Sequence, residues 1–347
     1  MMRPSINRSR ASFPDISGVT MLTDHQATDA QNTYSLDLSV VIPVYKSNAI
    51  LPVLVSRLEA VLLPSSHRYE ILLIDDGSMD DTWNTIDQLT RTHKSLRGIS
   101  FTRNYGQHNA LLCGIRAARG AVIVTMDDDL QHSPEDIPKL LTEIAKGYDV
   151  VYGTPVAEQH GVWRNLASQV AKMALQVALG VHAARSVSAF RAMRTSLREC
   201  FVDYRAPSVS IDVLLSWGTT HISALPVHHA PRHSGTSHYS VGRLLAHAFN
   251  MITGYSGLPL RMASLLGFMM TLFGIGILGY VVVRYFWLGN PVPGFPFLAS
   301  IIVIFSGAQL FSIGIIGEYV ARLHFRMMDR PTYNIRQETK ITDASRT

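Results

Sequence analysis

The sequence predicts a Rossmann-like α/β domain with a mostly parallel sheet, followed by an amphipathic juxtamembrane helix and two transmembrane helices. Three observations support this fold class. Short apolar runs alternate with helix-like stretches over residues 38–230, polar signatures follow three of these runs, and two long uncharged segments lie towards the C-terminus. Strand–helix alternation is typical of a parallel sheet with right-handed crossovers.

Five apolar runs predict the strands. They are LSVVIPV (38–44), YEILLID (69–75), LRGISF (96–101), AVIVTMD (121–127) and YDVVYG (148–153). The segments between them have the apolar spacing of helices, at 50–63, 80–93, 107–118 and 134–146. The first 36 residues are polar and lack the apolar core of a signal peptide, so we expect a mobile extension.

Polar signatures stand where three predicted strands end. They are DDGS (75–78), RNYGQH (103–108) and DDDLQ (127–131). Ligands of open α/β sheets bind at the carboxyl ends of the strands, so these signatures predict one shared site.

The DDD cluster suggests a metal site. In an extended segment alternate residues face the same side, so Asp127 and Asp129 would face one site with Asp128 turned away. Two carboxylates on one side suit Mg²⁺ or Mn²⁺ bridging a diphosphate. The alternative is an acidic loop that caps the helix at 134–146, where SPED is a good start signal. A second acidic pair at the end of a neighbouring strand, in DDGS, favours the metal site.

Two C-terminal segments are long enough to cross a membrane. Residues 262–283 carry no charge, and a second span fits 296–317. A buried helix of a soluble protein is the alternative for either segment, but two adjacent ones argue against it. The connecting loop at 286–294 has no Lys or Arg, whereas Arg261 precedes the first span and basic residues follow the second. The positive-inside rule therefore places both ends in the cytoplasm.

The expected organisation has five parts. Residues 240–261 look amphipathic and predict a helix on the membrane surface, or else a core helix of the soluble domain. The parts are the N-terminal extension 1–36, the α/β domain 37–239, the juxtamembrane helix 240–261, the two spans 262–318 and a cytoplasmic tail 319–347.

The composition is that of a basic chain with more apolar residues than a typical soluble enzyme. The chain has 347 residues, of which 47% are hydrophobic and 16% charged, and its formal net charge is +5. That charge suits a phosphate-bearing partner or an anionic membrane without choosing between them. Cys113 and Cys200 have no metal or redox spacing and predict reduced thiols in a cytosolic environment.

Several motifs together carry a family resemblance. They include VVIPVYKSN, LLIDDGSMDDT, RNYGQHNALLCGIRAARG, MDDDLQHSPEDIPKLL, VHHAPRHSGTSHYSVGRLL and GEYVARLHFRMMDRPTY. With two spans, they resemble the polyisoprenyl-phosphate glycosyltransferases of family 2, which have the GT-A fold. The resemblance covers roughly residues 38–335. Within that family the residues of these motifs are most similar to those of the undecaprenyl-phosphate 4-deoxy-4-formamido-L-arabinose transferases.

The resemblance implies a reaction and its partners. A sugar would move from a nucleotide diphosphate, expected to be UDP, to the phosphate of a polyprenol, expected to be undecaprenyl phosphate. The anomeric carbon would invert, Mg²⁺ or Mn²⁺ would assist, and the product would serve lipid A or polysaccharide modification in the cell envelope. The resemblance also implies a multi-pass protein of the bacterial inner membrane with a cytoplasmic catalytic domain. It further implies a homo-oligomer such as a tetramer, and no nucleic-acid partner.

It also implies residue roles, motif by motif. The nucleotide would be bordered or bonded by Pro43, Tyr45, Asp75, Asp76, Arg103 and Gln107. Asp127 and Asp129 would hold the metal, Gln131 would contact the donor's diphosphate or sugar, and either Asp128 or Asp129 is a candidate base.

On the acceptor side, Arg164 and Ser168 resemble the pair that holds the acceptor phosphate. Arg232 lies in RHSGTSHY, which resembles the loop that closes over the diphosphates. Lys46 and Ser47 depart from the family's usual Asn-Glu, so contacts to the base or ribose are expected to differ.

Two other functions remain open. A processive polysaccharide synthase would have more spans and a Gln-x-x-Arg-Trp motif, and the sequence has neither. A non-catalytic membrane protein that binds a nucleotide sugar would not require the intact DDGS and DDDLQ signatures. Loss of transfer on Asp127→Ala separates it from an enzyme.

Overall fold

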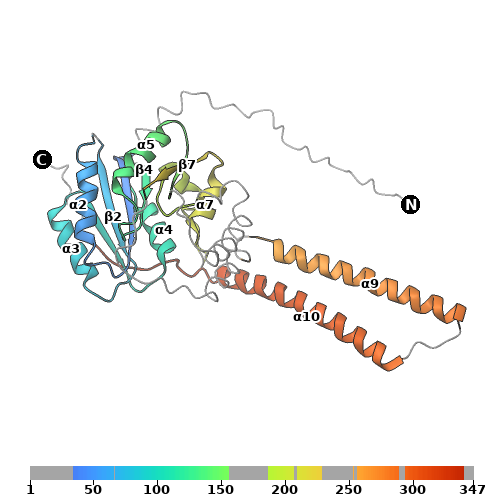
Figure 1. Cartoon of the computed structure of the whole chain (residues 1–347). Coiled ribbons are helices and arrows are strands. Elements are labelled where there is room, and N and C mark those ends of the chain that lie inside the picture. The colour runs from blue at the N-terminus through green and yellow to red at the C-terminus, as the bar shows by residue number, and fades with distance from the viewer. Residues whose placement is uncertain are drawn as a thin grey trace, which may run out of the picture.

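The computed structural model combines an α/β domain with a long helical hairpin (Figure 1). It describes residues 34–65, 67–155, 187–206, 209–228, 253, 256–288 and 294–339. The predicted N-terminal extension lies almost wholly outside these residues, and so does most of the predicted juxtamembrane helix.

The sheet of the α/β domain has eight strands in the order β7-β5-β6-β4-β1-β2-β3-β8. They are β1 (Leu36–Val44), β2 (Tyr69–Asp75), β3 (Leu96–Phe101), β4 (Gly120–Thr125), β5 (Val150–Pro155), β6 (Arg191–Arg194), β7 (Ile222–Val227) and β8 (Ile335–Glu338). The pairs β4–β1, β1–β2, β2–β3 and β5–β7 are parallel, while β6 and β8 run antiparallel to their neighbours. The predicted mostly parallel α/β sheet is confirmed.

Helices cover both faces of this sheet. One face packs against α2 (Leu51–Leu62), α3 (Thr82–Thr92) and α5 (Ile137–Ala145), which follows the short helix η2 (Pro134–Asp136). The other face packs against α4 (Gln107–Ala117), α7 (Ile211–Gly218) and η3 (Thr195–Cys200). The result is a three-layer sandwich in which the sheet is buried on both sides.

Strand β1 shows how the sequence produces two cores. Val40 and Ile42 face the core under α2, whereas Val41, between them, faces the core under α4, and all three are fully buried. Successive strand residues point to opposite faces, so a sheet covered on both sides needs a continuous apolar run. Each such side chain contributes roughly 1.5–3 kcal/mol through burial.

The predicted elements of the first half agree with the structure, with one difference that affects the site. The strand expected over 121–127 ends at Thr125, and residues 128–129 form a turn. The premise of an extended segment through the three aspartates is therefore wrong. Leu130 adopts φ 60°, in the left-handed region, which bends the chain away from the strand direction.

The hairpin consists of α9 (Leu258–Leu288) and α10 (Gly294–Met327). Leu258–Arg284 and Ser300–Met327 are long and apolar enough to cross a membrane, and neither is buried within the protein. A core helix of a soluble protein would be mostly covered, so that alternative is disfavoured. The two helices approach closely at Gly274, where a Cβ atom would lie 3.0 Å from the Cζ atom of Phe305.

The loop end of the hairpin carries a cation that lies just before the predicted loop. Arg284 belongs to α9, and its guanidinium donates a hydrogen bond to the Tyr280 hydroxyl at 2.7 Å. At the other end, Arg322 donates to Glu318 at 2.7 Å, four residues earlier on α10. Basic residues thus stand at both ends, with Arg261, Arg326 and Arg330 adding to the end next to the α/β domain.

The chain after α10 returns to the α/β domain. Strand β8 pairs with β3 at the edge of the sheet, although it follows both hairpin helices in sequence. This stretch falls in the predicted tail, because IRQE contains one apolar residue among three polar ones and gives no strand signal. All four side chains of β8 are exposed, so its pairing depends on backbone bonds and on flanking contacts.

Candidate active site

The predicted signatures meet at one edge of the sheet. The sheet has the neighbouring strands β4, β1, β2 and β3 at its centre, and their carboxyl ends lie side by side. The loops that follow these ends hold Tyr45, Asp76, Arg103 and Asp127. Hydrogen bonds connect these loops to one another. The predicted segments thus lie next to one another, and their binding of a shared ligand stays a prediction.

Asp128 joins the loop after β4 to the loop after β1. Its Oδ2 atom accepts a hydrogen bond from the backbone N–H of Tyr45 at 3.3 Å and another from the Ser47 hydroxyl at 2.5 Å. Burial raises the pKa of Asp128, against the opposing effect of these two donors and with a small contribution from neighbouring Asp129. Ser47, one of the two departures from the family pattern, is thus a site residue whose role sequence reasoning missed.

The two predicted metal ligands lie on either side of Asp128 in the turn. The Oδ1 atom of Asp127 accepts a hydrogen bond from Gln107 Nε2 at 2.6 Å. The Oδ1 atom of Asp129 accepts one from the backbone N–H of Gln131 at 3.1 Å. Because residues 128–129 form a turn, alternation along a strand does not establish that the two carboxylates face one point. Their pairing stays a prediction.

Asp75 and Asp76 are buried and organise the loops around them. Asp75 accepts hydrogen bonds from the Ser78 N–H at 3.0 Å and the Ser100 hydroxyl at 2.7 Å. Asp76 accepts from the N–H groups of Tyr105 and Gly106, at 2.7 and 2.8 Å. With 1% and 3% of their surfaces exposed, both use their carboxylates inside the protein. Their predicted contacts to base and ribose stay a prediction.

Gly77 allows two of these loops to touch. It adopts φ 68°, and a Cβ atom there would lie 2.3 Å from the backbone carbonyl carbon of Arg103. Any side chain at this position would push the loops apart, so the glycine of DDGS has a steric reason. Burial raises the pKa of neighbouring Asp76, although its two amide donors act in the opposite direction.

The remaining predicted nucleotide residues differ in exposure. Pro43 is buried within β1, opposite Ile74, whereas Tyr45 is 45% exposed. The guanidinium of Arg103 stacks 4.6 Å from the centre of the Tyr105 ring. Gln107 is the first residue of α4, and the free backbone N–H groups at this end of a helix carry partial positive charge. They lie close to residues 127–129, which we call the acidic turn.

A buried cluster supports the end of β4. Arg191, only 1% exposed, forms an ion pair with Asp212 and donates from Nε to the Thr125 hydroxyl at 3.1 Å. The Tyr152 hydroxyl donates to the same carboxylate at 3.1 Å. Thr125 is the last residue of β4, so this pair fixes the start of the acidic turn. An arginine inside the apolar stretch AFRAM was the sequence signal for it.

The donor set fits a hard divalent cation. Among the described residues no three His, Cys, Asp or Glu side chains are grouped to hold an ion by themselves. Mg²⁺ and Mn²⁺ need less than that, because one or two carboxylates and the phosphates of a substrate complete their shell. Asp127 and Asp129, both partly exposed, provide that kind of ligand.

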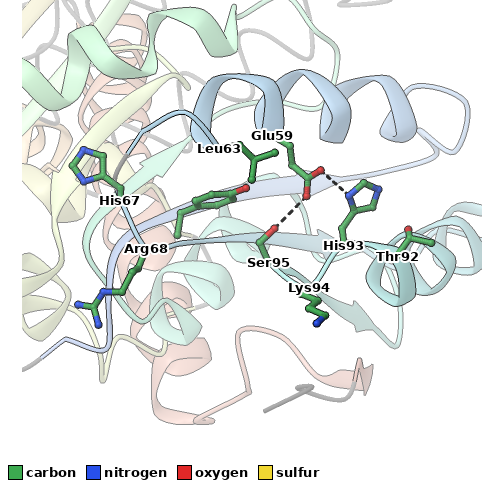
Figure 2. A pocket seen from close by; sticks show the side chains of 9 residues that line it. Glu59, Leu63, His67, Arg68, Thr92, His93, Lys94 and Ser95 are labelled. Atoms are coloured by element: carbon green, nitrogen blue, oxygen red, sulfur yellow. Dashed lines mark hydrogen bonds and ion pairs between the residues drawn. The ribbon is translucent and has the colours of Figure 1, made fainter. Parts of the chain in front are cut away.

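A pocket of about 370 Å³ lies at the opposite end of the sheet (Figure 2). Glu59 accepts hydrogen bonds there from His93 and Ser95, as the dashed lines show. The residues lining it are Glu59, Leu63, His67, Arg68, Tyr69, Thr92, His93, Lys94 and Ser95. They belong to the amino ends of β2 and β3 and to the adjacent helix ends, far from the aspartates, so this pocket is not the candidate site.

The predicted acceptor-side residues are Arg164, Ser168 and Arg232. All three lie outside the residues that the structure describes. Their roles stay predictions from the family resemblance.

Comparison with known proteins agrees with the geometry. Residues 39–201 match the family described as Glycosyl transferase family 2. The chain is 36% identical over 319 residues to the undecaprenyl-phosphate 4-deoxy-4-formamido-L-arabinose transferase of Pseudomonas aeruginosa (strain LESB58), covering 90% of this chain and 93% of the relative. It is 34% identical over 301 residues to the protein of the same name from Pseudomonas savastanoi pv. phaseolicola, covering 86% and 89%.

Among solved structures, the chain is similar to glucosyl-3-phosphoglycerate synthase from Mycobacterium tuberculosis. That structure is a complex with Mn²⁺, uridine-diphosphate-glucose and phosphoglyceric acid. The TM-score is 0.48 with 18% sequence identity, over 68% of this chain and 84% of the synthase.

Proposed function

Because this chain belongs to glycosyl transferase family 2 and is a polyprenyl-phosphate glycosyltransferase, we propose that it transfers a sugar from a UDP-sugar to undecaprenyl phosphate. The single observation that carries this proposal is the gathering of DDGS, RNYGQH and DDDLQ at one edge of a sheet joined to an apolar hairpin. The two Pseudomonas relatives have undecaprenyl phosphate in their names, and they match 90% and 86% of this chain.

The proposed reaction is a single displacement. A phosphate oxygen of the acceptor forms a bond to the anomeric carbon, and the bond from that carbon to the β-phosphate oxygen of the donor breaks. UDP leaves with the electron pair, and the anomeric carbon inverts. The attacking oxygen is already anionic at neutral pH, so orientation matters more than deprotonation. Asp128 has its carboxylate engaged by Tyr45 and Ser47, which favours a positioning role over that of a base.

The acidic turn would hold the donor's diphosphate. Asp127 and Asp129 would bind Mg²⁺ or Mn²⁺, and Gln131 would contact the diphosphate or the sugar. A bound divalent ion supplies positive charge next to the leaving group. Gln107 fixes the carboxylate of Asp127 at 2.6 Å, which reduces the reorganisation needed when the donor arrives. On the acceptor side we assign Arg164 and Ser168 to the lipid phosphate and Arg232 to the closing loop.

The hairpin would place the catalytic domain at the cytoplasmic face of the bacterial inner membrane. Arg261, Arg322, Arg326 and Arg330 gather at the end next to the catalytic domain, against Arg284 at the loop end. That imbalance supports cytoplasmic ends for both helices. A lipid phosphate at the bilayer surface would then lie within reach of the domain. A homotetramer is the assembly we expect from the family resemblance.

The proposal is tested with the purified full-length protein in nanodiscs. Undecaprenyl phosphate, Mn²⁺ and a panel of UDP- and GDP-sugars, including UDP-4-deoxy-4-formamido-L-arabinose, are supplied, and mass spectrometry identifies the lipid product. We expect one sugar per lipid, loss of product with EDTA, and recovery with Mn²⁺. A ladder of added sugars would indicate a processive synthase. Donor binding without product from any sugar would indicate a non-catalytic binding protein.

A further inference from the structure

The chain that leaves α10 contacts the loop on which the proposed nucleotide site depends. We call residues 332–339 the C-terminal clasp and residues 102–106 the nucleotide loop. Seven residues, 328–334, connect α10 to β8, so they span at most about 25 Å. The end of the hairpin is therefore tied closely to the edge of the sheet where the nucleotide loop begins.

We propose that the C-terminal clasp positions the nucleotide loop for donor binding, so that donor affinity depends on the segment that follows the second hairpin helix. This inference rests on the proposed function for the identity of the donor. The positioning itself rests on contacts that the structure shows.

The clasp holds both backbone groups of Thr102, the first residue of the loop. The Thr102 N–H donates to the carbonyl oxygen of Asn334 at 3.0 Å. The Thr102 carbonyl oxygen accepts from Arg336 Nη2, also at 3.0 Å. A loop residue with both backbone groups bonded to one segment cannot turn without breaking that attachment.

Aromatic packing extends the contact. The Tyr333 ring stacks on Phe101 with centroids 5.1 Å apart and planes 7° from parallel. The Tyr105 ring meets the same phenylalanine edge-on at 5.7 Å. Phe101 is fully buried and is the last residue of β3, so Tyr333 and Tyr105 share one support. Such aromatic pairs add to the free energy of burial through their geometry.

The far side of the loop is held by the catalytic domain itself. Asp76 accepts from the N–H groups of Tyr105 and Gly106, and the next residue, Gln107, donates to Asp127. The nucleotide loop is thus held at its start by the clasp and at its end by Asp76. Removing either support leaves the loop attached on one side only.

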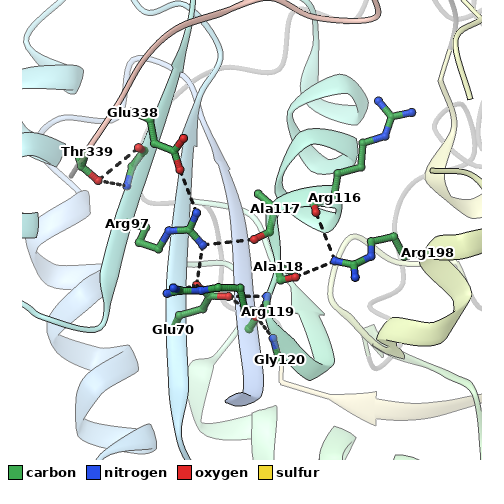
Figure 3. A network of polar contacts seen from close by, with 12 residues as sticks. Glu70, Arg97, Arg116, Ala117, Ala118, Arg119, Gly120, Arg198, Glu338 and Thr339 are labelled. Atoms are coloured by element: carbon green, nitrogen blue, oxygen red, sulfur yellow. Dashed lines mark hydrogen bonds and ion pairs between the residues drawn. The ribbon is translucent and has the colours of Figure 1, made fainter. Parts of the chain in front are cut away.

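The clasp is itself anchored by side chains beyond its pairing with β3 (Figure 3). Arg97 Nη2 donates to Glu338 at 2.9 Å, and the Gly98 N–H donates to the Thr339 hydroxyl at 2.9 Å. The four side chains of β8 are exposed, so the strand adds little to either core. The contacts of the clasp run along β3 from Arg97 to Phe101 and continue to Thr102, so the clasp both extends the sheet and holds the start of the nucleotide loop.

The test compares Tyr333→Ala and Arg336→Ala with a matched control, Gln337→Ala, whose side chain is exposed on the same strand. Hydrogen exchange of the full-length proteins is followed in peptides that cover the nucleotide loop and, as a check on folding, α2. Isothermal titration with UDP and Mn²⁺ measures affinity. We expect faster exchange in the loop alone and about five- to tenfold weaker UDP binding for the first two variants. Gln337→Ala should match the unaltered protein. Tyr333→Phe keeps the aromatic ring, so its loop exchange and UDP affinity should also be those of the unaltered protein.

Unchanged exchange in the loop of Tyr333→Ala and Arg336→Ala would overturn the inference. Faster exchange with unchanged UDP affinity would equally overturn it, because the clasp would then not govern donor binding. If the unaltered protein binds no UDP, the proposed donor is wrong and the donor part of this inference fails with it. The exchange measurement still decides whether the clasp positions the loop, so the two failures are distinguishable.

Discussion

Buried carboxylates have charged partners at one end of the central sheet and uncharged partners at the other. At the amino end, Glu70 is 1% exposed and meets two arginines, Arg97 at 2.9 Å and Arg119 at 3.0 Å (Figure 3). At the carboxyl end, Asp75 and Asp76 are equally buried, yet their carboxylates accept from backbone N–H groups and a hydroxyl. Within the described residues, neither of them forms an ion pair.

The difference separates a structural site from a functional one. A carboxylate neutralised by two arginines has no charge left for a ligand and serves the fold. Backbone N–H groups and a hydroxyl carry no formal charge, so they do not neutralise a carboxylate as an arginine does, and such surroundings favour a cation over a bare diphosphate. This contrast supports a donor that arrives with a divalent ion.

The largest effect on stability is expected from Glu70→Gln. Removing one partner of a buried ion pair costs on the order of 3–5 kcal/mol. Glu338 remains as a partner of Arg97 and lowers that cost. Thermal unfolding should show a much lower midpoint, while UDP affinity at low temperature stays unchanged. A midpoint within one degree of the unaltered protein would contradict the structural role of this network.

Asp127→Asn should have the next largest effect, on transfer and not on folding. Loss of one preorganised electrostatic group at a reacting centre typically costs about 10²–10³ in rate, or roughly 2.7–4 kcal/mol. The assay is product formation at saturating donor, with the unfolding midpoint as the control. Retention of full activity would remove the acidic turn from the mechanism.

Asp76→Asn tests the amide-bound carboxylates. Asparagine has one acceptor oxygen in place of two, so the N–H of Tyr105 or Gly106 loses its partner, at a cost of about 1–3 kcal/mol. We expect weaker UDP binding by roughly tenfold and faster amide exchange in residues 102–106. Equal exchange in both proteins would show that Asp76 does not hold the loop.

At acid pH the unaltered protein and Glu70→Gln should differ less in their free energy of unfolding. Burial by itself would raise the pKa of Glu70, but hydrogen bonds from Ser39, Arg97 and Arg119 outweigh it and hold that pKa below its ordinary value. The stabilisation is therefore present above the unfolded-state pKa of about 4.3 and is lost as pH falls through the lowered folded-state pKa. Unfolding free energies measured from pH 6 to pH 3 should converge only at the acid end.

The smallest effect is expected from Asp87→Asn, which removes a carboxylate that belongs to neither cluster. Asp87 pairs with Arg91 on the exposed surface of α3. Pairs of this kind contribute about 0.3–0.5 kcal/mol. Stability and transfer should both stay close to those of the unaltered protein. A large change in either would mean that loss of any acidic charge disturbs the chain, and the contrast between the two ends would lose its meaning.

Sequence reasoning recovered most of the sheet because β1 to β5 are apolar runs bounded by turn residues. The strands β6, β7 and β8 were not predicted. RAMR and IRQE carry charged residues and are only four residues long, and ISALPV of β7 contains Pro226, a residue type that argues against a strand. The strands β6 and β8 pair with β4 and β3, and this pairing is not visible in their own residues. The acidic turn shows the same limit, since the left-handed conformation of Leu130 is not evident from its residue type.

The sequence by itself determined the α/β class, the order of its central elements, the apolar hairpin and the identity of the acidic signatures, because periodicity and strand-end position are local properties of the chain. Only the tertiary structure decided that Asp76 turns inwards to the amides of the nucleotide loop, that Ser47 holds Asp128, and that a strand from beyond the hairpin contacts the start of the nucleotide loop. These contacts join residues from about 30 to more than 230 positions apart in the sequence. Residues so far apart are brought together by the packing of the whole domain, which local sequence patterns do not reveal.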